Sequence, residues 1–130
     1  MSRIVAIGVG CRAGVSGDSI VALARRALSE FGEPEGERRV FTIDAKAAEV
    51  GIVEAAGLLG AKLTPLPLVA LQAQASRVLT RSRAAEARFG APNIAEAAAL
   101  AGAGAGARLL GPRVAMDGAT CAVALSTERP

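Results

Sequence analysis

The sequence predicts an α/β fold: one domain built as a three-layer α/β/α sandwich around a mixed, largely parallel sheet. Short runs of β-branched residues alternate with helical patterns along the first half of the chain, and a hairpin signal lies near its end. The chain has 130 residues, of which 52% are hydrophobic, and this suits one domain with a core of its own. No internal repeat or linker-like stretch divides it, so we expect a single domain over residues 1–130.

The first elements form a strand–helix–strand unit. A nearly continuous apolar run at residues 4–9 is typical of a strand that is buried on both faces. Ser16 then occupies the N-cap position of a helix. The apolar face of that helix recurs at helical spacing and consists of Ile20, Leu23, Ala24, Ala27, Leu28 and Phe31. Residues 33–39 are predicted as an exposed turn, and a strand at 40–43 follows, parallel to the first because one helix connects the two.

The middle of the chain continues the alternation and then loses it. A helix is expected at 47–59, ended by Gly60, followed by a short strand at 62–64 and a brief helix after Pro67. Between residues 73 and 91 the apolar pattern weakens into polar and basic residues. This segment is either a long mobile loop or a loosely attached helix.

An alanine-rich helix is predicted after this segment. Asn93 and Glu96 have the spacing of a capping box, in which each side chain bonds to the backbone of the other residue. The helix is expected to end near Ala101. A flexible connection is expected at the three glycines that follow, Gly102, Gly104 and Gly106.

One or two strands complete the predicted sheet. They are expected at 108–114 and 119–126, and Asp117-Gly118 between them is a strong signal for a tight hairpin turn. Cys121 alternates with apolar residues on one face of the last strand, so it is predicted to be a core residue.

The formal net charge of +3 is concentrated between residues 73 and 92, where four arginines face one acid, Glu86. The arginines are Arg77, Arg81, Arg83 and Arg88. A local excess of this kind favours a small polyanionic ligand, and the segment is either a solvated helix face or a lid over a ligand with several carboxylates. Nucleic acid is not expected as a partner, because three phenylalanines are the only aromatic residues on which bases could stack.

Several classes of protein are disfavoured. Cys11 and Cys121 are far apart, as expected in a reducing cytoplasm rather than in a disulfide-stabilised secreted domain. The N-terminal apolar run is too short for a signal peptide and no later stretch is long enough to span a membrane, so we expect a soluble cytoplasmic protein. No metal is expected, because the chain has no histidine. No cofactor is expected either, since the motif Gly8–Gly14 is one residue longer than the dinucleotide fingerprint.

Candidate ligand-binding residues lie in the loops that follow the first two strands. In open α/β sheets ligands bind beyond the carboxyl ends of the strands, so loops 10–16 and 44–49 should be neighbours. The first loop offers the backbone of Gly10, the guanidinium of Arg12, which can bind a carboxylate or phosphate through two hydrogen bonds, and Ser16 at a helix N-terminus. Alternatively, the glycines only shape the turn between strand and helix.

Catalysis is a second possibility for these loops. Cys11 lies beside a helix N-terminus and an arginine, two influences that lower the pKa of a thiol. Without any histidine, such a nucleophile would need Lys46 or a carboxylate as its proton partner; otherwise Cys11 is a small packing residue. Asp44, Lys46 and Glu49 are candidates for acid, base and electrostatic stabiliser, or they form a surface ion-pair cluster at a helix start.

Three motifs together resemble the CobE/CbiG C-terminal family of cobalamin biosynthesis. They are the run Gly-Val-Gly-Cys-Arg-x-Gly-x-Ser at 8–16, the run Thr-Ile-Asp-x-Lys-x-x-Glu at 42–49, and the alanine-rich stretch at 90–100. They occur in this order over nearly the whole chain. The family usually has a serine where this sequence has Asn93, which keeps an oxygen at the cap. The resemblance implies a role in assembling the corrin ring of vitamin B12, whose intermediates carry many acetate and propionate carboxylates.

The resemblance leaves three functions open. The chain either binds a precorrin or a hydrogenobyrinic-acid-type corrinoid, or catalyses a step, or docks onto other enzymes of the pathway. In CbiG-type proteins this domain is joined to an N-terminal partner and the whole opens a precorrin lactone, whereas this chain has the length of the stand-alone type. The residues expected to bind the ligand are Gly10, Cys11, Arg12, Ser16, Arg77 and Asn93.

Overall fold

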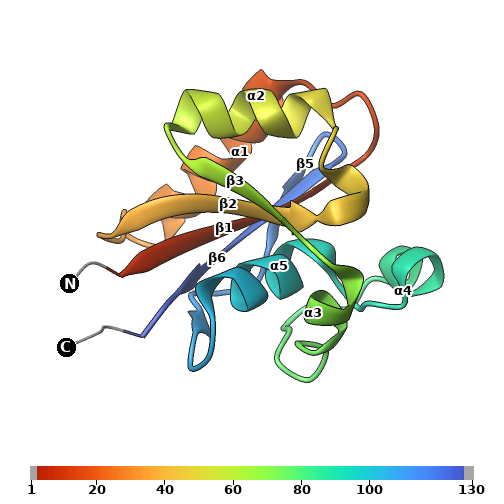
Figure 1. Cartoon of the computed structure of the whole chain (residues 1–130). Coiled ribbons are helices and arrows are strands. Elements are labelled where there is room, and N and C mark those ends of the chain that lie inside the picture. Colours follow the sequence, from red (N-terminus) through yellow and green to blue (C-terminus); the bar gives the residue numbers. More distant parts are fainter. Residues whose placement is uncertain (1–2, 128–130) are drawn as a thin grey trace.

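A six-stranded mixed sheet lies between two layers of helices in the computed structural model, which describes residues 3–127 (Figure 1). The strands are β1 (Ile4–Cys11), β2 (Glu37–Ile43), β3 (Lys62–Leu66), β4 (Arg108–Leu109), β5 (Val114–Met116) and β6 (Ala119–Leu125). Their order is β3-β2-β1-β6-β4, and β5 also pairs with β6. β1, β2 and β3 run parallel, whereas β6 is antiparallel to β1, and β4 and β5 are antiparallel to β6. The predicted α/β sandwich with a mixed sheet is confirmed.

Helices cover both faces of the sheet (Figure 1). The helices are α1 (Gly17–Glu30), α2 (Val50–Leu59), α3 (Leu68–Gln72), α4 (Arg83–Phe89) and α5 (Ile94–Ala103). α1 and α2 pack on one face, where Val5, Ile7 and Val9 of β1 point, and α3 and α5 pack on the other. None of the helices between residues 3 and 127 is long and apolar enough to cross a membrane.

Glycines allow α5 to lie directly on the sheet. A Cβ atom on Gly8 of β1 would be 1.9 Å from the carbonyl oxygen of Ala95 and 2.7 Å from the backbone nitrogen of Ala99. On the other side of the contact, a Cβ atom on Gly102 would be 2.3 Å from the ring of Phe41. Gly102 therefore belongs to the packed helix, and the prediction that it starts a flexible connection is wrong.

Two boundaries in the first half of the chain differ from the prediction. β2 starts at Glu37, because residues 37–39, predicted as a turn, pair with the start of β1. Their charged side chains remain at the surface, where Arg39 forms an ion pair with Glu37. α2 starts at Val50 rather than at residue 47, and Asp44–Lys46 before it form a short 3-10 turn, η1. Gly60 ends α2 in the left-handed conformation, as expected.

In the second half of the chain, the segment for which a loop or a loosely attached helix was predicted contains a helix. In the segment 73–91, α4 is a true helix: the Ser82 side chain caps its start and Gly90 ends it in the left-handed conformation. The strand predicted at 108–114 is interrupted at Gly111-Pro112, where proline offers no N–H to the ladder, and resumes as β5. Asp117 and Gly118 both have positive φ, at 52° and 84°, which confirms the predicted hairpin turn.

Candidate functional site

The loops after β1 and β2 lie side by side at the carboxyl end of the sheet. The carboxylate of Glu49 connects them: its Oε2 accepts a hydrogen bond from the backbone nitrogen of Gly14 at 3.0 Å. Its Oε1 lies 3.9 Å from the Nζ atom of Lys46, and both side chains are largely shielded from solvent. The expected neighbourhood of the two loops is therefore confirmed.

A cleft of about 220 Å³ opens at the same end of the sheet, on the face that carries α5. Its walls come from three separate parts of the chain: Gly10 to Arg12 after β1, residues 82–89 with α4, and the region from Arg113 to Thr120 with the β5–β6 turn. Ile94 at the start of α5 lies between them. An adjoining hollow of about 480 Å³ extends over the β5–β6 turn and shares Arg12, Ser82 and Arg113 with the cleft. We call the two together the arginine cleft.

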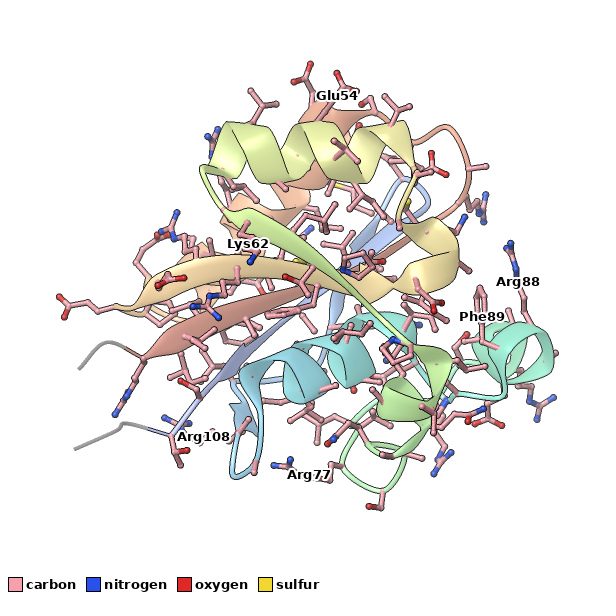
Figure 2. The ribbon with its side chains drawn as sticks, viewed as in Figure 1. Glu54, Lys62, Arg77, Arg88, Phe89 and Arg108 are labelled. Atoms are coloured by element: carbon pink, nitrogen blue, oxygen red, sulfur yellow. The ribbon has the colours of Figure 1, made fainter. Side chains whose placement is uncertain are left out.

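Three arginines line this cleft: Arg12, Arg88 and Arg113. None of them forms an ion pair with a carboxylate in the described part of the chain, whereas the neighbouring Arg81 pairs with Glu86 at 3.0 Å. The guanidinium of Arg88 lies over the ring of Phe89, 4.9 Å from its centre, and Figure 2 shows both side chains next to each other on α4. Unpaired guanidinium groups around one concave surface favour an anionic ligand.

The cleft also offers apolar and neutral polar groups. Phe89 and Ile94 supply apolar surface, and Ser82 and Thr120 supply hydroxyl groups. The Thr120 hydroxyl donates to the carbonyl of Gly10 at 3.4 Å, and the Ser82 hydroxyl accepts from the backbone nitrogen of Ala85. The arrangement suits a ligand that carries anionic groups on an otherwise apolar framework.

Lys46 and Glu49 lie next to the first loop, but neither they nor Asp44 line the arginine cleft. Both oxygens of Glu49 are engaged, one by Gly14 and one by Lys46. Asp44 is exposed at the start of η1. The geometry of Lys46 and Glu49 is that of an ion pair at a helix start, which was one of the two alternatives.

The surroundings of Cys11 act against activation of its thiol. The side chain packs against the apolar cluster under α1 and α2, and this burial raises the pKa of the thiol. The nearby Glu49 carboxylate raises it further, and Lys46 opposes the shift only in part. Of the two alternatives for Cys11, these contacts favour the small packing residue over the nucleophile. Cys121 is a core residue, as predicted, and burial raises its pKa to about 12.

The structure does not bring the remaining predicted residues into the cleft. Asn93 is fully buried, and its side chain accepts from the backbone nitrogen of Glu96 and donates to the carbonyl of Thr80. The Ser16 hydroxyl caps α1 and bonds to Ser19. Arg77 donates to the carbonyl of Ala107, near the amino end of β1 and away from α4, as the positions of Arg77 and Arg88 in Figure 2 show.

Sequence reasoning missed Arg113, Ser82 and the function of Glu96. The predicted capping box is half right: Asn93 caps α5, but the Glu96 carboxylate bonds to Leu79, Thr80 and Arg113 instead of to Asn93. Arg113 belongs to no recognisable motif. It lies at the cleft because β5, which follows it, pairs with β6, and β6 pairs with β1. The only available signal was a lone cation just before a predicted hairpin turn.

Known proteins resemble this chain in sequence and in structure. Residues 5–124 match the family model described as cobalamin synthesis G C-terminus. Protein CobE of a Sinorhizobium species is 35% identical over 119 residues, which are 91% of this chain and 77% of that protein.

Two crystal structures extend the likeness. CobE, a protein from the cobalamin (vitamin B12) biosynthetic pathway, superposes with a TM-score of 0.89 and 34% identity over 99% of this chain and 95% of that one. The cobalamin biosynthesis protein chiG from Agrobacterium tumefaciens superposes with a TM-score of 0.73 and 38% identity, covering 95% of this chain and 99% of the other. The chain therefore belongs to the cobalamin synthesis G C-terminus family and is a cobalamin biosynthesis protein of the CobE and CbiG type.

Proposed function

We propose that the protein binds a corrin-ring intermediate of cobalamin biosynthesis through its carboxylates, in the arginine cleft. The observation that supports this most directly is the convergence of Arg12, Arg88 and Arg113 on one concave surface, where none of them forms an ion pair within residues 3–127. Corrin intermediates carry several acetate and propionate groups at their rim. A guanidinium group binds a carboxylate through two parallel charge-assisted hydrogen bonds, which are among the strongest polar contacts in proteins.

The size of the cleft indicates which part of the ligand it holds. A site for an entire drug-sized molecule has a volume of roughly 300–1,000 Å³. The smaller part of the arginine cleft, next to Phe89 and Ile94, has about 220 Å³. A corrin is larger than a drug-sized molecule, so one edge of the macrocycle enters between Phe89 and Ile94 while the rest lies over the β5–β6 turn. In this arrangement the rim carboxylates come within reach of the three arginines.

Absorbance titration with hydrogenobyrinic acid tests the proposal, because the corrin chromophore responds to a change in its surroundings. We expect a saturable spectral change at micromolar protein together with heat in a calorimetric titration. A titration with neither a spectral change nor heat would contradict the proposed function.

A catalytic step on a precorrin is a second candidate. It is favoured by the contact of Lys46 with Glu49 in a shielded position beside the loop that contributes Arg12. In that case Asp44 or Glu49 would act as general base and Lys46 as electrophilic partner. Mass spectrometry of the bound ligand after incubation decides between the two: an unchanged mass supports binding alone, and a changed mass supports catalysis.

Docking onto other enzymes of the pathway is a third candidate. The outer surface of α2 exposes Val50, Val53 and Leu58, with 66%, 50% and 56% of their surface accessible. Exposed apolar residues on one helix suit contact with another protein. A pull-down from a cobalamin-producing lysate with the wild-type chain and with Val53→Glu as bait tests this: partners of the pathway should be retained by the first and lost by the second.

A further inference from the structure

One carboxyl group connects two walls of the arginine cleft. Glu96 of α5 is fully buried. Its Oε1 accepts hydrogen bonds from the backbone nitrogens of Leu79 and Thr80 at 2.6 and 3.0 Å. Its Oε2 accepts from the backbone nitrogen of Arg113 at 2.9 Å. The first two donors belong to the segment that leads into α4, and the third immediately precedes β5.

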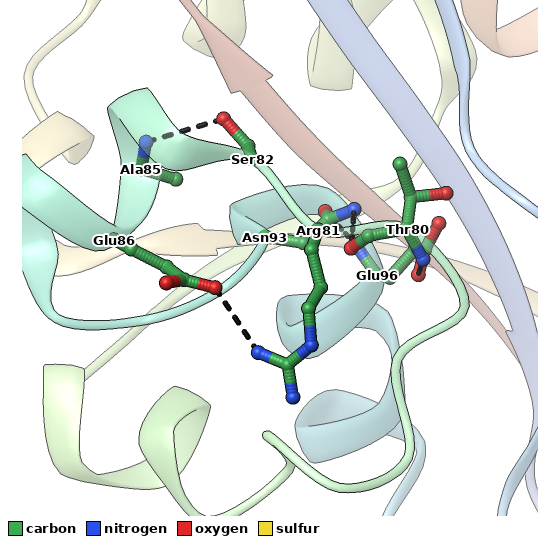
Figure 3. A network of polar contacts seen from close by, with 7 residues as sticks. All are labelled: Thr80, Arg81, Ser82, Ala85, Glu86, Asn93 and Glu96. Carbon is green, nitrogen blue, oxygen red and sulfur yellow. Dashed lines mark hydrogen bonds and ion pairs between the residues drawn. The ribbon is translucent and has the colours of Figure 1, made fainter.

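The two walls depend on Glu96 to different extents. The wall before α4 has further attachments to the start of α5: Asn93 donates to the carbonyl of Thr80 at 3.1 Å, and Ser82 donates to the carbonyl of Pro92 at 2.7 Å. Figure 3 shows Thr80, Asn93 and Glu96 of this network close together, with Ser82 at the start of α4. Among the hydrogen bonds of residues 3–127, Arg113 has a single one to α5, the bond to Glu96.

A buried carboxyl group is costly for the fold unless its hydrogen bonds are satisfied, and the donors that satisfy it lose their acceptor when the group is removed. All three donors to Glu96 are backbone groups, and both segments that supply them carry cleft residues, Ser82 and Arg113. We propose that Glu96 is a positioning residue of the arginine cleft, which fixes Arg113 relative to the wall that carries α4. This inference rests on the proposed function and assigns to Glu96 the placement of one of its three arginines.

Glu96→Gln tests the two walls separately, because it weakens the attachment of one wall and changes the shape of the side chain little. A glutamine has one acceptor oxygen and one NH₂ donor. Keeping the oxygen toward Leu79 and Thr80 preserves two hydrogen bonds, so the amide group turns toward the Arg113 nitrogen, which then faces a donor. Glu86→Gln is the matched control, because the Glu86 carboxylate in the same region bonds to the side chain of Arg81, which is exposed.

Amide hydrogen exchange measures the positioning without any ligand. In the wild-type chain the amides of Leu79, Thr80 and Arg113 should exchange slowly, although all three residues lie outside helices and strands. In Glu96→Gln the Arg113 amide should exchange at least about tenfold faster, as expected when one hydrogen bond to a charged group is lost, and Glu86→Gln should leave it unchanged. Fast exchange of these amides in the wild-type chain overturns the inference, even if Glu96→Gln does not fold.

Titration with hydrogenobyrinic acid connects the positioning to the ligand. Glu96→Gln should weaken binding about tenfold, should add nothing in an Arg113→Ala background, and should keep its full effect in an Arg12→Ala background. An equal loss in both backgrounds would mean that Glu96 acts only on overall stability, and it would overturn the inference. If the wild-type chain does not bind the corrinoid, the proposed function fails, and the exchange of the Arg113 amide alone decides whether Glu96 holds this wall.

Discussion

Arg12 is the residue of the first loop whose chemistry is best suited to a corrinoid. Its side chain is exposed, lines both parts of the cleft and has no ion-pair partner within residues 3–127. Its backbone nitrogen bonds to the carbonyl of Gly118 at 2.9 Å, which fixes the start of the side chain next to the β5–β6 turn. A guanidinium that is held at its base and free at its end is ready to bind a carboxylate without first breaking another contact.

Replacing Arg12 by alanine should weaken binding of hydrogenobyrinic acid by about 1.5–3 kcal/mol, because a charge-assisted hydrogen bond contributes this much. The loss corresponds to a dissociation constant about ten to more than one hundred times higher, which calorimetry can measure. Arg25→Ala on the exposed face of α1 is the control, since it removes the same charge far from the cleft. Equal losses for the two variants would show that only net charge matters.

Arg77→Ala distinguishes the cleft from the basic segment as a whole. Because Arg77 bonds to Ala107 near the other end of the sheet, this variant should leave the affinity for the corrinoid unchanged. The same calorimetric titration checks it. A loss comparable to that of Arg12→Ala would extend the ligand site to the region around β4 and would argue against the arginine cleft as the place of binding.

The raised pKa of the Cys11 thiol predicts slow alkylation in the folded protein. The folded pKa lies above the ordinary value, so the thiolate is less populated than in an unfolded chain at every pH below that raised pKa. Glu49→Gln removes a carboxylate that raises the pKa and should speed the reaction, and Lys46→Gln should slow it. The rate of iodoacetamide modification between pH 7 and 9, followed by mass spectrometry, tests both directions. A Cys11 that reacts faster than free cysteine would restore the nucleophile hypothesis.

The packing of α5 on the sheet depends on Gly8 of β1. Gly8→Ala should destabilise the fold by about 3 kcal/mol or more, at the upper end of overpacking costs, because the added carbon meets backbone atoms of α5 rather than flexible side chains. Urea unfolding measures the change. The contrasting control is Gly57→Ala on α2, where a Cβ atom meets nothing within 4 Å, and which should stabilise by about 0.5–1 kcal/mol.

Local sequence signals predicted the elements well where the stabilising interactions join residues that are close in sequence. Ser16 and Asn93 cap their helices as expected, and Asp117-Gly118 forms the expected turn. α4 was ambiguous because a seven-residue helix is too short to show an apolar period, and its stability comes from the packing of Ala85 and Phe89 on the core. Glu96 followed a capping pattern, yet the donors to its carboxylate come from residues 16 or 17 positions away in sequence.

At the scale of the molecule, the cleft depends on the order of the strands. β6 pairs with β1 over the full length from Val5 to Cys11, which brings the β5–β6 turn to the loop that contains Arg12. The sequence predicts the hairpin but not the edge of β1 with which it pairs, since both edges satisfy the same apolar pattern. For this reason the strand-end rule located Arg12, whereas Arg113 and the wall formed by α4 became visible only in the structure.

A cleft lined by three arginines that have no ion-pair partner within residues 3–127 should bind its ligand mainly by charge. The formal net charge of the chain is also positive, at +3. Raising sodium chloride from about 0.1 M to about 1 M shortens the Debye length from about 10 Å to about 3 Å, so the affinity for hydrogenobyrinic acid should fall, by at least about tenfold if two arginine–carboxylate pairs are formed. Methyl esters of the same corrinoid carry no charge at the rim and should bind weakly at both concentrations. If the ester binds as well as the acid and salt strengthens both, the apolar surface of Phe89 and Ile94 would dominate recognition, and the arginines would serve another ligand.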